Sequence, residues 1–418
     1  MKAIILQVNE ALETNIALVY KSVFLGETAA ILTGMGLEVS VYDATIEGYC
    51  LNDLVKAFCE EPQLVIFVAD VQQSRITKRV AEYCKLCSPK SKILVIGRAT
   101  SFIPQFFLRY PFDAVHVRGD REAAIISYVE YLNGVISLGD ISNIAVLENN
   151  TIVNTKRTVW LEPKFWKTPD LSKLNIEAYE RLNQKQHPNR SLILGVTATK
   201  GCSYGCRYCG ASLEEGKQVR YGIAKSIIEW GNSINLDCTV QLWSPNILES
   251  IEWLQGFVET YEKDESTFSW RGVARLASIN EEKIAVINQH NCKEIAIGLE
   301  MIKRKTNNSL KGTGKQFTDA VDLFRKYSIN LKCLLMLGYP GYEIDDIVHT
   351  IKLLNENGLK YRITGYTPLH DLMRLSVEEL DQLMIENYDR RLFYYNNQSN
   401  IDSKLFYEIL STNGEVLL

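Results

Sequence analysis

The stretch Thr199-Lys-Gly-Cys202-Ser-Tyr-Gly-Cys206-Arg-Tyr-Cys209-Gly210 places three cysteines within eight residues. It follows the apolar run Leu192–Ala198, which we predict to be a buried strand. The cysteine loop therefore stands at the carboxyl end of a strand, where (β/α) barrels carry their chemistry. A structural zinc site normally has four ligands, and no fourth Cys or His lies nearby. Three thiolates fit a 4Fe–4S cluster with one iron left open for a small molecule.

The residues beside these cysteines also suit the binding of a cluster. Gly201 and Gly205 let the backbone fold tightly around a bulky cluster. Tyr208 can shield a cluster or stack on a ligand. The chain has ten cysteines, and seven are scattered: Cys50, Cys59, Cys84, Cys87, Cys238, Cys292 and Cys333. We interpret these seven as packing residues, including the Cys84–Cys87 pair, which lies in a helical stretch without a redox fold around it.

Strand-like and helix-like stretches alternate after residue 191. The predicted strands are Leu192–Ala198, Thr239–Trp243, Gly272–Leu276, Glu294–Leu299, Leu331–Leu337 and Tyr361–Thr364. Six strand–helix units within residues 191–370 predict a partial (β/α)6 barrel rather than a full eight-unit barrel.

Strand periodicity identifies the side chains that face the inside of this barrel. In the fourth strand, Ile295, Ile297 and Leu299 share one face, so we expect Glu300 on the opposite, inner face. The same argument places several other polar and aromatic side chains inside: Gln241, Trp243, Arg275 and Tyr366. Such an interior is more polar than a packed barrel needs, and this favours a binding site.

Two regions precede the barrel in the sequence, and one follows it. Residues 1–138 alternate strands with helices and predict a doubly wound parallel sheet, so the fold class is α/β. Residues 139–190 contain a small hairpin and scattered prolines, and we interpret them as a linker. Residues 371–418 are predicted to be a short helical C-terminal region, with an aromatic patch at Leu392–Tyr395.

The net charge and the hydropathy of the chain limit the kinds of binding partner that we expect. With 46 basic and 50 acidic residues the net charge is −4, which gives no electrostatic reason to expect a nucleic acid. Apolar runs such as Leu64–Val71 are too short to cross a bilayer, so no membrane partner is expected. The N-terminus lacks a secretory signal pattern, and we expect a cytoplasmic protein.

The cysteine spacing resembles the Cys-x3-Cys-x2-Cys signature of the radical S-adenosylmethionine (radical SAM) superfamily, and the resemblance covers nearly the whole chain. The barrel looks like the branch that includes methylthiotransferases and cobalamin-dependent radical enzymes. Three further stretches match that branch in the right order: Trp270–Glu300, Leu337–Glu343 and Tyr366–Pro368. Between them they carry the branch's Arg-containing strand, its Gly-x-Pro-Gly turn and its closing strand.

The resemblance implies the cofactors and their ligands. Cys202, Cys206 and Cys209 would bind a 4Fe–4S cluster, which an external flavodoxin- or ferredoxin-type donor would reduce. Arg275 would pair with the methionine carboxylate of S-adenosylmethionine, and Glu300 would take its amino group or ribose hydroxyls. The other expected cofactor contacts are the backbone at Gly338, Tyr339 and Gly341, the interior side chains Gln241, Trp243 and Tyr366, and Tyr208. Ser244 and Asn246 stand where relatives have other amino-binding residues, and we expect one of them to substitute.

Cobalamin is an open question at this stage. Residues 1–138 resemble the cobalamin-binding domain of the same enzymes, with landmarks such as Gly119-Asp-Arg-Glu122. Arg98 and Arg121, however, stand where relatives have glycines along the path of the nucleotide tail. No Asp-x-His-x-x-Gly loop is present to supply an axial histidine. A Rossmann-like domain that only shapes the substrate cleft is the competing interpretation.

We therefore expect a radical enzyme that abstracts hydrogen from an unactivated carbon of a small molecule or peptide, leading to epimerisation, dehydration, cyclisation or cleavage. The alternative is a cobalamin-dependent radical C-methyltransferase. A scaffold protein with a structural metal is the third hypothesis. A methylthiotransferase is disfavoured because no second three-cysteine cluster stands out. Cys333 shares an apolar strand face and so is not favoured as a hydrogen donor, whereas a tyrosine such as Tyr366 stays open.

Overall fold

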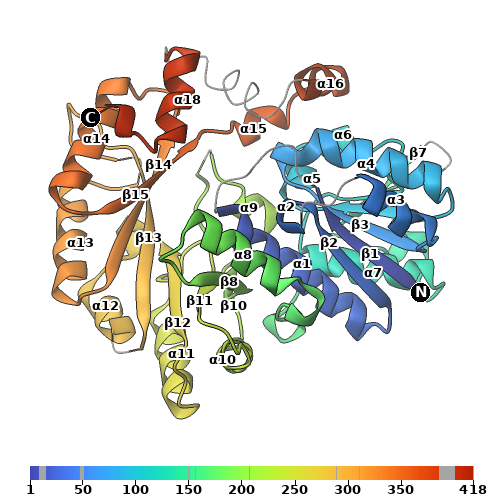
Figure 1. The fold of residues 1–418 in the computed structure, drawn as a ribbon, viewed down its shortest axis with the longest axis horizontal. Helices are drawn as coiled ribbons and strands as arrows, with labels where there is room; N and C mark the ends of the chain where they lie inside the picture. The colour runs from blue at the N-terminus through green and yellow to red at the C-terminus, as the bar shows by residue number, and fades with distance from the viewer. Residues whose placement is uncertain are drawn as a thin grey trace. The chain divides into compact units, whose positions relative to one another are not determined.

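The computed structural model describes residues 1–8, 16–47, 51–148, 151–155, 157–206, 208–288, 290–309, 311–385 and 401–417. The chain forms two compact units (Figure 1). The N-terminal unit comprises residues 1–196, 200–222 and 369–388. The barrel unit comprises residues 197–199, 223–368 and 389–418. The segment with the three cysteines thus groups with the N-terminal unit, although the sequence places it within the barrel domain.

The N-terminal unit is built on a seven-stranded sheet. Its order is β2 (Glu38–Asp43), β1 (Lys2–Gln7), β3 (Leu64–Val68), β4 (Lys92–Ile96), β5 (Ala114–His116), β6 (Ile144–Glu148) and β7 (Thr151–Asn154). The first five strands are parallel, which confirms the predicted doubly wound sheet. The predicted hairpin, β6–β7, pairs antiparallel onto β5. Part of the stretch expected to be a linker therefore extends this sheet.

Helices cover both faces of that sheet. They are α1 (Ile16–Gly34), α3 (Leu51–Cys59), α4 (Ser74–Cys87), α5 (Arg98–Phe102), α6 (Pro104–Phe107) and α7 (Arg121–Leu132). α1 packs beside α7, and α3 packs beside α4 (Figure 1). The central strand β3 is apolar and buried throughout, and β4 is so after its first residue, as expected of strands between two helical layers. Ligands of such sheets bind beyond the carboxyl ends of the strands.

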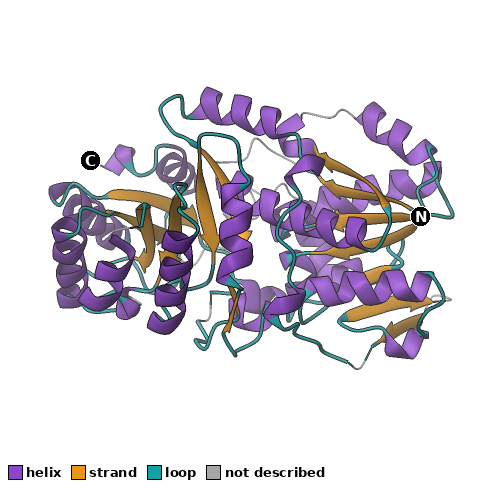
Figure 2. Cartoon of the chain, turned by 90° about the horizontal axis from the view of Figure 1, so that it is seen from below, coloured by secondary structure: helices purple, strands orange, loops and turns teal. Residues whose placement is uncertain are grey.

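The barrel-type sheet has six strands that follow one another in chain order. They are β8 (Leu192–Thr197), β11 (Cys238–Trp243), β12 (Ser269–Ala274), β13 (Cys292–Glu300), β14 (Asn330–Leu337) and β15 (Lys360–Gly365). The helices that alternate with them are α10 (Ala224–Asn232), α11 (Ile251–Lys263), α12 (Glu281–Asn288), α13 (Gly314–Lys326) and α14 (Ile344–Glu356). Figure 2 distinguishes the helices of the chain, in purple, from its strands, in orange. The expected partial (β/α)6 barrel is confirmed.

Burial along these strands separates an inner from an outer face. In β14, Leu331, Cys333, Leu335 and Leu337 are buried, while the residues between them are partly exposed. Cys333 is fully buried on the face that α13 covers, and burial raises the pKa of its thiol to about 12. The sequence-based expectation that Cys333 points away from the barrel interior agrees with this.

The C-terminal region divides between the units. α15 (Leu369–Leu372) and α16 (Val377–Ile385) belong to the N-terminal unit, where Arg109 forms an ion pair with Asp381. α18 (Ser403–Ser411) packs on β15 in the barrel unit. The predicted aromatic patch Leu392–Tyr395 lies outside the described residues. Among the helices that the structure describes, none combines the length and apolar character that spanning a bilayer requires.

Candidate active site

The cysteine loop starts from a short two-stranded ribbon, β9 (Thr199–Lys200) and β10 (Arg220–Tyr221), and ends at α9 (Ala211–Glu214). Cys202, Cys206 and Cys209 are partly buried and form no disulfide. The Cys202 N–H donates to the Gly216 carbonyl at 3.0 Å, and the Cys209 N–H donates to the Cys206 carbonyl at 3.0 Å. These bonds order the loop through its backbone.

Glycine is required where the loop begins. Gly201 has φ of +86°, and a Cβ there would lie 2.1 Å from the Gln218 carbonyl oxygen. Among the described residues, no three Cys, His, Asp or Glu side chains surround one point closely enough to hold a single metal ion. A 4Fe–4S cluster does not need that arrangement, because each of its thiolates binds a different iron. The three cysteines therefore suit a cluster better than a single ion.

The other cysteines that the structure describes do not join this loop. Cys87 lies beside Cys59 rather than forming a unit with Cys84, and burial and the Cys59 thiol raise its pKa. Burial raises the pKa of Cys84 to about 12. Thiols held protonated in this way are poor nucleophiles and poor metal ligands. Cys50, also interpreted as a packing residue, lies outside the described residues.

In the barrel unit, three of the expected site residues meet in one network. The Asn246 Oδ1 accepts the Arg275 backbone N–H at 3.1 Å, and the Asn246 Nδ2 donates to Ser278 at 2.8 Å. The Ser244 Oγ accepts the Asn246 N–H at 3.1 Å. Asn246 thus holds the backbone of Arg275, which follows β12 directly rather than lying within the strand as predicted. Its position makes Asn246 a support for Arg275.

Glu300 occupies a strained position at the end of β13. Its φ is +63°, a left-handed conformation that glycine favours, and the pairing with β14 shifts register at this point. Its buried carboxylate forms an ion pair with Lys311 at 2.8 Å. A Cβ at Gly298 would lie 2.3 Å from the Lys311 Nζ, so glycine makes room for this pair. Lys311 was missed because its loop shows no periodic pattern.

The remaining barrel candidates fall into two groups. Tyr339 and Tyr366 meet edge to face, with ring centroids 5.1 Å apart, beside the left-handed glycines Gly338 and Gly341. Gln241 accepts a hydrogen bond from Arg271 at 2.8 Å. Trp243, two residues further along β11, is partly buried. Arg271 was not singled out from the sequence. In the N-terminal unit, Tyr208 is partly buried within the cysteine loop.

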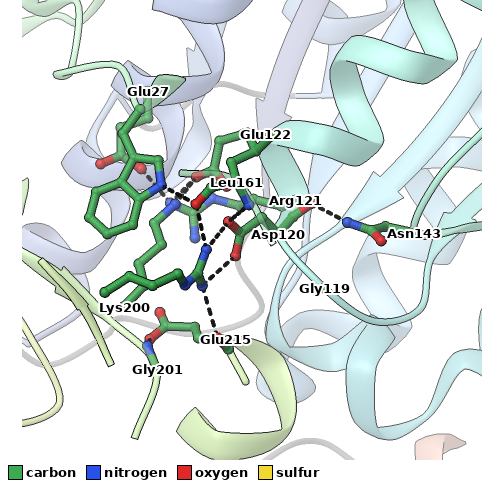
Figure 3. Close-up of polar contacts among 12 residues, drawn as sticks. Glu27, Gly119, Asp120, Arg121, Glu122, Asn143, Leu161, Lys200, Gly201 and Glu215 are labelled. Carbon is green, nitrogen blue, oxygen red and sulfur yellow. Dashed lines mark hydrogen bonds and ion pairs between the residues drawn. The ribbon is translucent and has the colours of Figure 1, made fainter. Parts of the chain in front are cut away.

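The N-terminal unit contains a small pocket that opens to solvent. It lies at the carboxyl ends of β4 and β5 and reaches the residues flanking the cysteine loop. Its lining is Phe24, Gly97, Arg98, Ser101, His116, Gly119, Asp120, Arg121, Glu122, Lys200, Glu214 and Glu215. Figure 3 shows the polar contacts around Asp120, Glu122 and Lys200.

Three buried polar atoms at the carboxyl edge of this sheet have no hydrogen-bond partner among the described protein groups. They are the Gln7 Oε1 at the end of β1, the Ser101 Oγ in α5 and the His116 Nδ1 at the end of β5. The His116 Nε2 donates to the Gly119 carbonyl at 2.9 Å, so the Nδ1 is an acceptor. Burial lowers the pKa of His116 to about 4, which keeps the ring neutral. Polar atoms of this kind are normally satisfied, and here they face the edge where a ligand binds.

Glu215, on the pocket wall, accepts a hydrogen bond from the Gly201 N–H at 2.9 Å. Burial raises the pKa of Glu215 to about 7, although that bond and Lys200 act to lower it. A carboxyl whose pKa is raised on folding favours the folded state below its unfolded pKa of about 4.3. That contribution disappears as the pH rises through the folded pKa.

We therefore expect this carboxyl to lower the free energy of unfolding of the metal-free protein by ~1–3 kcal/mol between pH 5 and pH 8. Glu215→Gln should remove most of that decrease, because the amide does not ionise. Urea unfolding at both pH values measures it. Glu177→Gln, at a carboxylate with 86% exposed side chain in the same unit, should leave the decrease unchanged. An equal decrease in the wild type and Glu215→Gln would contradict the prediction.

Comparison with known proteins agrees with this geometry. Residues 196–354 match the model of the Radical SAM superfamily. An uncharacterised methyltransferase of Pyrococcus horikoshii is 22% identical over 349 residues, which are 79% of this chain and 72% of that protein.

Two solved structures share the fold of nearly the whole chain. TsrM of Kitasatospora setae, a radical S-adenosylmethionine methyltransferase with cobalamin and a [4Fe–4S] cluster bound, has a TM-score of 0.69 at 14% identity. The alignment covers 91% of this chain and 78% of TsrM. OxsB, a cobalamin-dependent S-adenosylmethionine radical enzyme, has a TM-score of 0.65 at 16% identity, covering 95% of this chain and 57% of OxsB.

The three-cysteine loop at a barrel strand lies within the matched stretch, so the chain contains a radical SAM domain over residues 196–354. It is an enzyme that uses a 4Fe–4S cluster and S-adenosylmethionine, and it has the fold of the members with an N-terminal cobalamin-binding-like domain. This removes the hypothesis of a scaffold protein with a structural metal.

Proposed function

We propose that the protein is a cobalamin-dependent radical SAM C-methyltransferase that acts on a small molecule or a peptide. The likeness to TsrM and OxsB over nine tenths of the chain supports this function. The sequence alone favours hydrogen abstraction without cobalamin. The fold comparisons favour the methyltransferase alternative instead.

The observation that carries the cobalamin assignment is the set of three unsatisfied buried atoms, on Gln7, Ser101 and His116. They line the carboxyl edge of a doubly wound sheet, and a ligand rich in amides and hydroxyls would satisfy them. The residues present therefore fit cobalamin. Gly97 is required by the protein itself, because a Cβ there would lie 2.4 Å from the Ala69 carbonyl oxygen.

The two arginines that spoke against cobalamin are held by the protein's own carboxylates. Arg121 pairs with Glu27, and its guanidinium lies 3.8 Å from the centre of the Phe24 ring. Arg98 lies 3.4 Å from a Glu214 oxygen. Their charges are thereby balanced within the N-terminal unit, which weakens the objection from sequence.

When bound, the cluster, S-adenosylmethionine and cobalamin supply a carbon-centred radical and a methyl group. The chain's own residues hold and orient these groups. Cys202, Cys206 and Cys209 would ligate the cluster, and Arg275, positioned by Asn246, would bind the methionine carboxylate. Glu300, held by Lys311, would accept hydrogen bonds from the amino group or ribose hydroxyls.

The aromatic residues and Cys333 complete the assignment. Tyr339 and Tyr366 would cover adenine and exclude water at the ends of their strands. Cys333 would take no part, since it is fully buried with a raised pKa. A flavodoxin- or ferredoxin-type protein would deliver the electrons, and the reducing cytoplasm would suit both that donor and unpaired cysteines.

The test is reconstitution with hydroxocobalamin, followed by desalting and a UV–visible spectrum. We expect a retained corrin band, and a transferred trideuteromethyl group when candidate substrates are incubated with methyl-labelled S-adenosylmethionine. Ser101→Ala should weaken cobalamin binding about three- to tenfold through one lost hydrogen bond. Thr77→Ala is the matched control, since it removes a buried, unsatisfied hydroxyl in α4 that does not line the pocket.

Loss of the corrin band on desalting, with 5′-deoxyadenosine still formed, would instead support the first-ranked expectation from sequence. The enzyme would then abstract hydrogen without cobalamin, and the products to seek are those of epimerisation, dehydration, cyclisation or cleavage.

A further inference from the structure

The segment that carries the cysteines is packed as part of the N-terminal unit. Residues 200–222 group with residues 1–196 rather than with the barrel strands they lie between in sequence. We propose that the turn Gly119–Glu122 holds both ends of the cluster loop, with Asp120 and Glu122 as positioning residues for the 4Fe–4S cluster. The N-terminal domain would then serve cluster binding whether or not cobalamin is bound.

The first anchor lies just before the first cysteine. The Lys200 Nζ stands 2.7 Å from a Glu122 carboxylate oxygen, and both side chains are only 3% exposed. The same ammonium lies 4.8 Å from the centre of the Trp166 ring. Burial alone would raise the pKa of Glu122, but the charges of Arg121 and Lys200 outweigh it and hold that pKa below its usual range. Glu122 is therefore ionised, and the pair fixes the chain two residues from Cys202.

The second anchor lies beyond the last cysteine. Arg220 binds both oxygens of Asp120, at 2.5 and 2.9 Å, and the Asp120 side chain is 1% exposed. Arg220 also donates to the carbonyls of Leu161 and Glu215, each at 2.8 Å. Asp120 in turn accepts the Leu161 N–H at 2.8 Å. The planar guanidinium of Arg220 is hydrogen-bonded on several sides. It therefore fixes the position of the end of the loop.

Two further contacts close the loop onto the domain. A Cβ at Gly210, next to Cys209, would lie 2.3 Å from the ring of Phe102, which is fully buried in α5. Only glycine lets the loop approach α5 this closely. Glu215 bonds the Gly201 N–H across the base of the loop at 2.9 Å. Each end of the loop is thus tied to the N-terminal domain, and the two ends are tied to each other.

These pairs matter because a buried charge without its partner is costly. Removing the negative charge of Asp120 or Glu122 leaves a buried cation, and the chain relieves this by moving Arg220 or Lys200 toward water. Both cations lie on the cluster loop. The loop therefore moves, and the cysteines lose the spacing that three irons require.

The test uses the full-length chain with Asp120→Asn and, as a milder change, Glu122→Gln, whose amide oxygen can still accept from Lys200. Asp113→Asn is the matched control in the same unit. Asp113 also binds a cation, Lys85 at 2.7 Å, and also accepts a backbone N–H, that of Ile93 at 2.8 Å. Hydrogen exchange of the metal-free protein, iron content after reconstitution and the electron paramagnetic resonance spectrum of the reduced cluster are measured.

We expect exchange in residues 200–222 to become on the order of tenfold faster in both loop variants, with lower iron content and an altered resonance spectrum. Asp113→Asn should leave all three unchanged relative to the wild type. If the loop variants exchange, bind iron and give spectra as the control does, the proposal is wrong. Faster exchange throughout β1, β3 and β4 would indicate that a variant unfolds globally. If Asp120→Asn unfolds in this way, the result for the milder variant Glu122→Gln decides whether the proposal holds. None of these readouts depends on methyl transfer, so the result is independent of the function proposed above.

Discussion

Cys206→Ala is expected to give a folded chain that binds no 4Fe–4S cluster and forms no 5′-deoxyadenosine from S-adenosylmethionine. The fold should survive because Cys206 is partly buried in a loop, and alanine retains the backbone carbonyl that accepts the Cys209 N–H. The cluster should not survive, because one of its irons then lacks a protein ligand in addition to the iron left open for S-adenosylmethionine. Iron and sulfide analysis after anaerobic reconstitution should fall from about four of each per chain to near zero.

Cys333→Ala is the matched control for this change. It removes a sulfur that is fully buried on the helix-covered side of β14, at a cost of ~1–2 kcal/mol in the free energy of unfolding. Cluster content, 5′-deoxyadenosine formation and the identity of the product should remain as in the wild type. A full cluster in Cys206→Ala would refute the ligand assignment. Loss of product with an intact cluster in Cys333→Ala would restore that thiol as a hydrogen donor.

Lys311→Met is expected to lower the free energy of unfolding by about 2–4 kcal/mol, because it leaves the Glu300 carboxylate buried without its cation. The double variant Glu300→Gln/Lys311→Met should recover much of the stability, since no buried charge remains.

Substitutions at Glu300 and Lys311 also distinguish an effect on stability from an effect on cofactor binding. Glu300→Gln alone and the double variant should both bind S-adenosylmethionine about tenfold or more weakly, since a charge-assisted hydrogen bond is lost. Lys326→Met is the control for the lysine change: its pair with Glu281 is exposed, and removing it should have little effect on either quantity. Unchanged cofactor affinity in Glu300→Gln, measured by titration calorimetry, would assign Glu300 to strand geometry alone.

The parts of the molecule that sequence predicts well are those set by local pattern. The barrel strands are recognisable as short apolar runs, and along β14 buried apolar side chains alternate with partly exposed ones. The cysteine spacing identifies its chemistry without reference to the rest of the chain. Alternation along Glu294–Leu299 predicts an inward-facing Glu300, and the structure shows that side chain buried at a left-handed residue where the pairing with β14 shifts register.

The parts that sequence does not predict depend on pairs far apart in the chain. Arg220 binds Asp120 from one hundred residues away, and nothing near either residue indicates its partner. Arg98 and Arg121 are visible as departures from the family pattern, but their pairing with Glu214 and Glu27 appears only in the structure. The assignment of the cysteine segment to the N-terminal unit follows from these same long-range pairs.

The return of α15 and α16 to the N-terminal unit has a consequence for how the protein is made. During synthesis the first strands and helices emerge long before residues 369–385, so this unit cannot be completed while the barrel is still being translated. Until then Arg109 lacks Asp381, and Gln105 lacks the Leu375 carbonyl. Bringing residues 369–385 back to the N-terminal unit closes a very large loop. Contacts between residues so far apart in the sequence form slowly, so the last stage of folding is slow. A chain stopped before residue 369 would keep its cysteine motif and yet remain permanently at that unfinished stage.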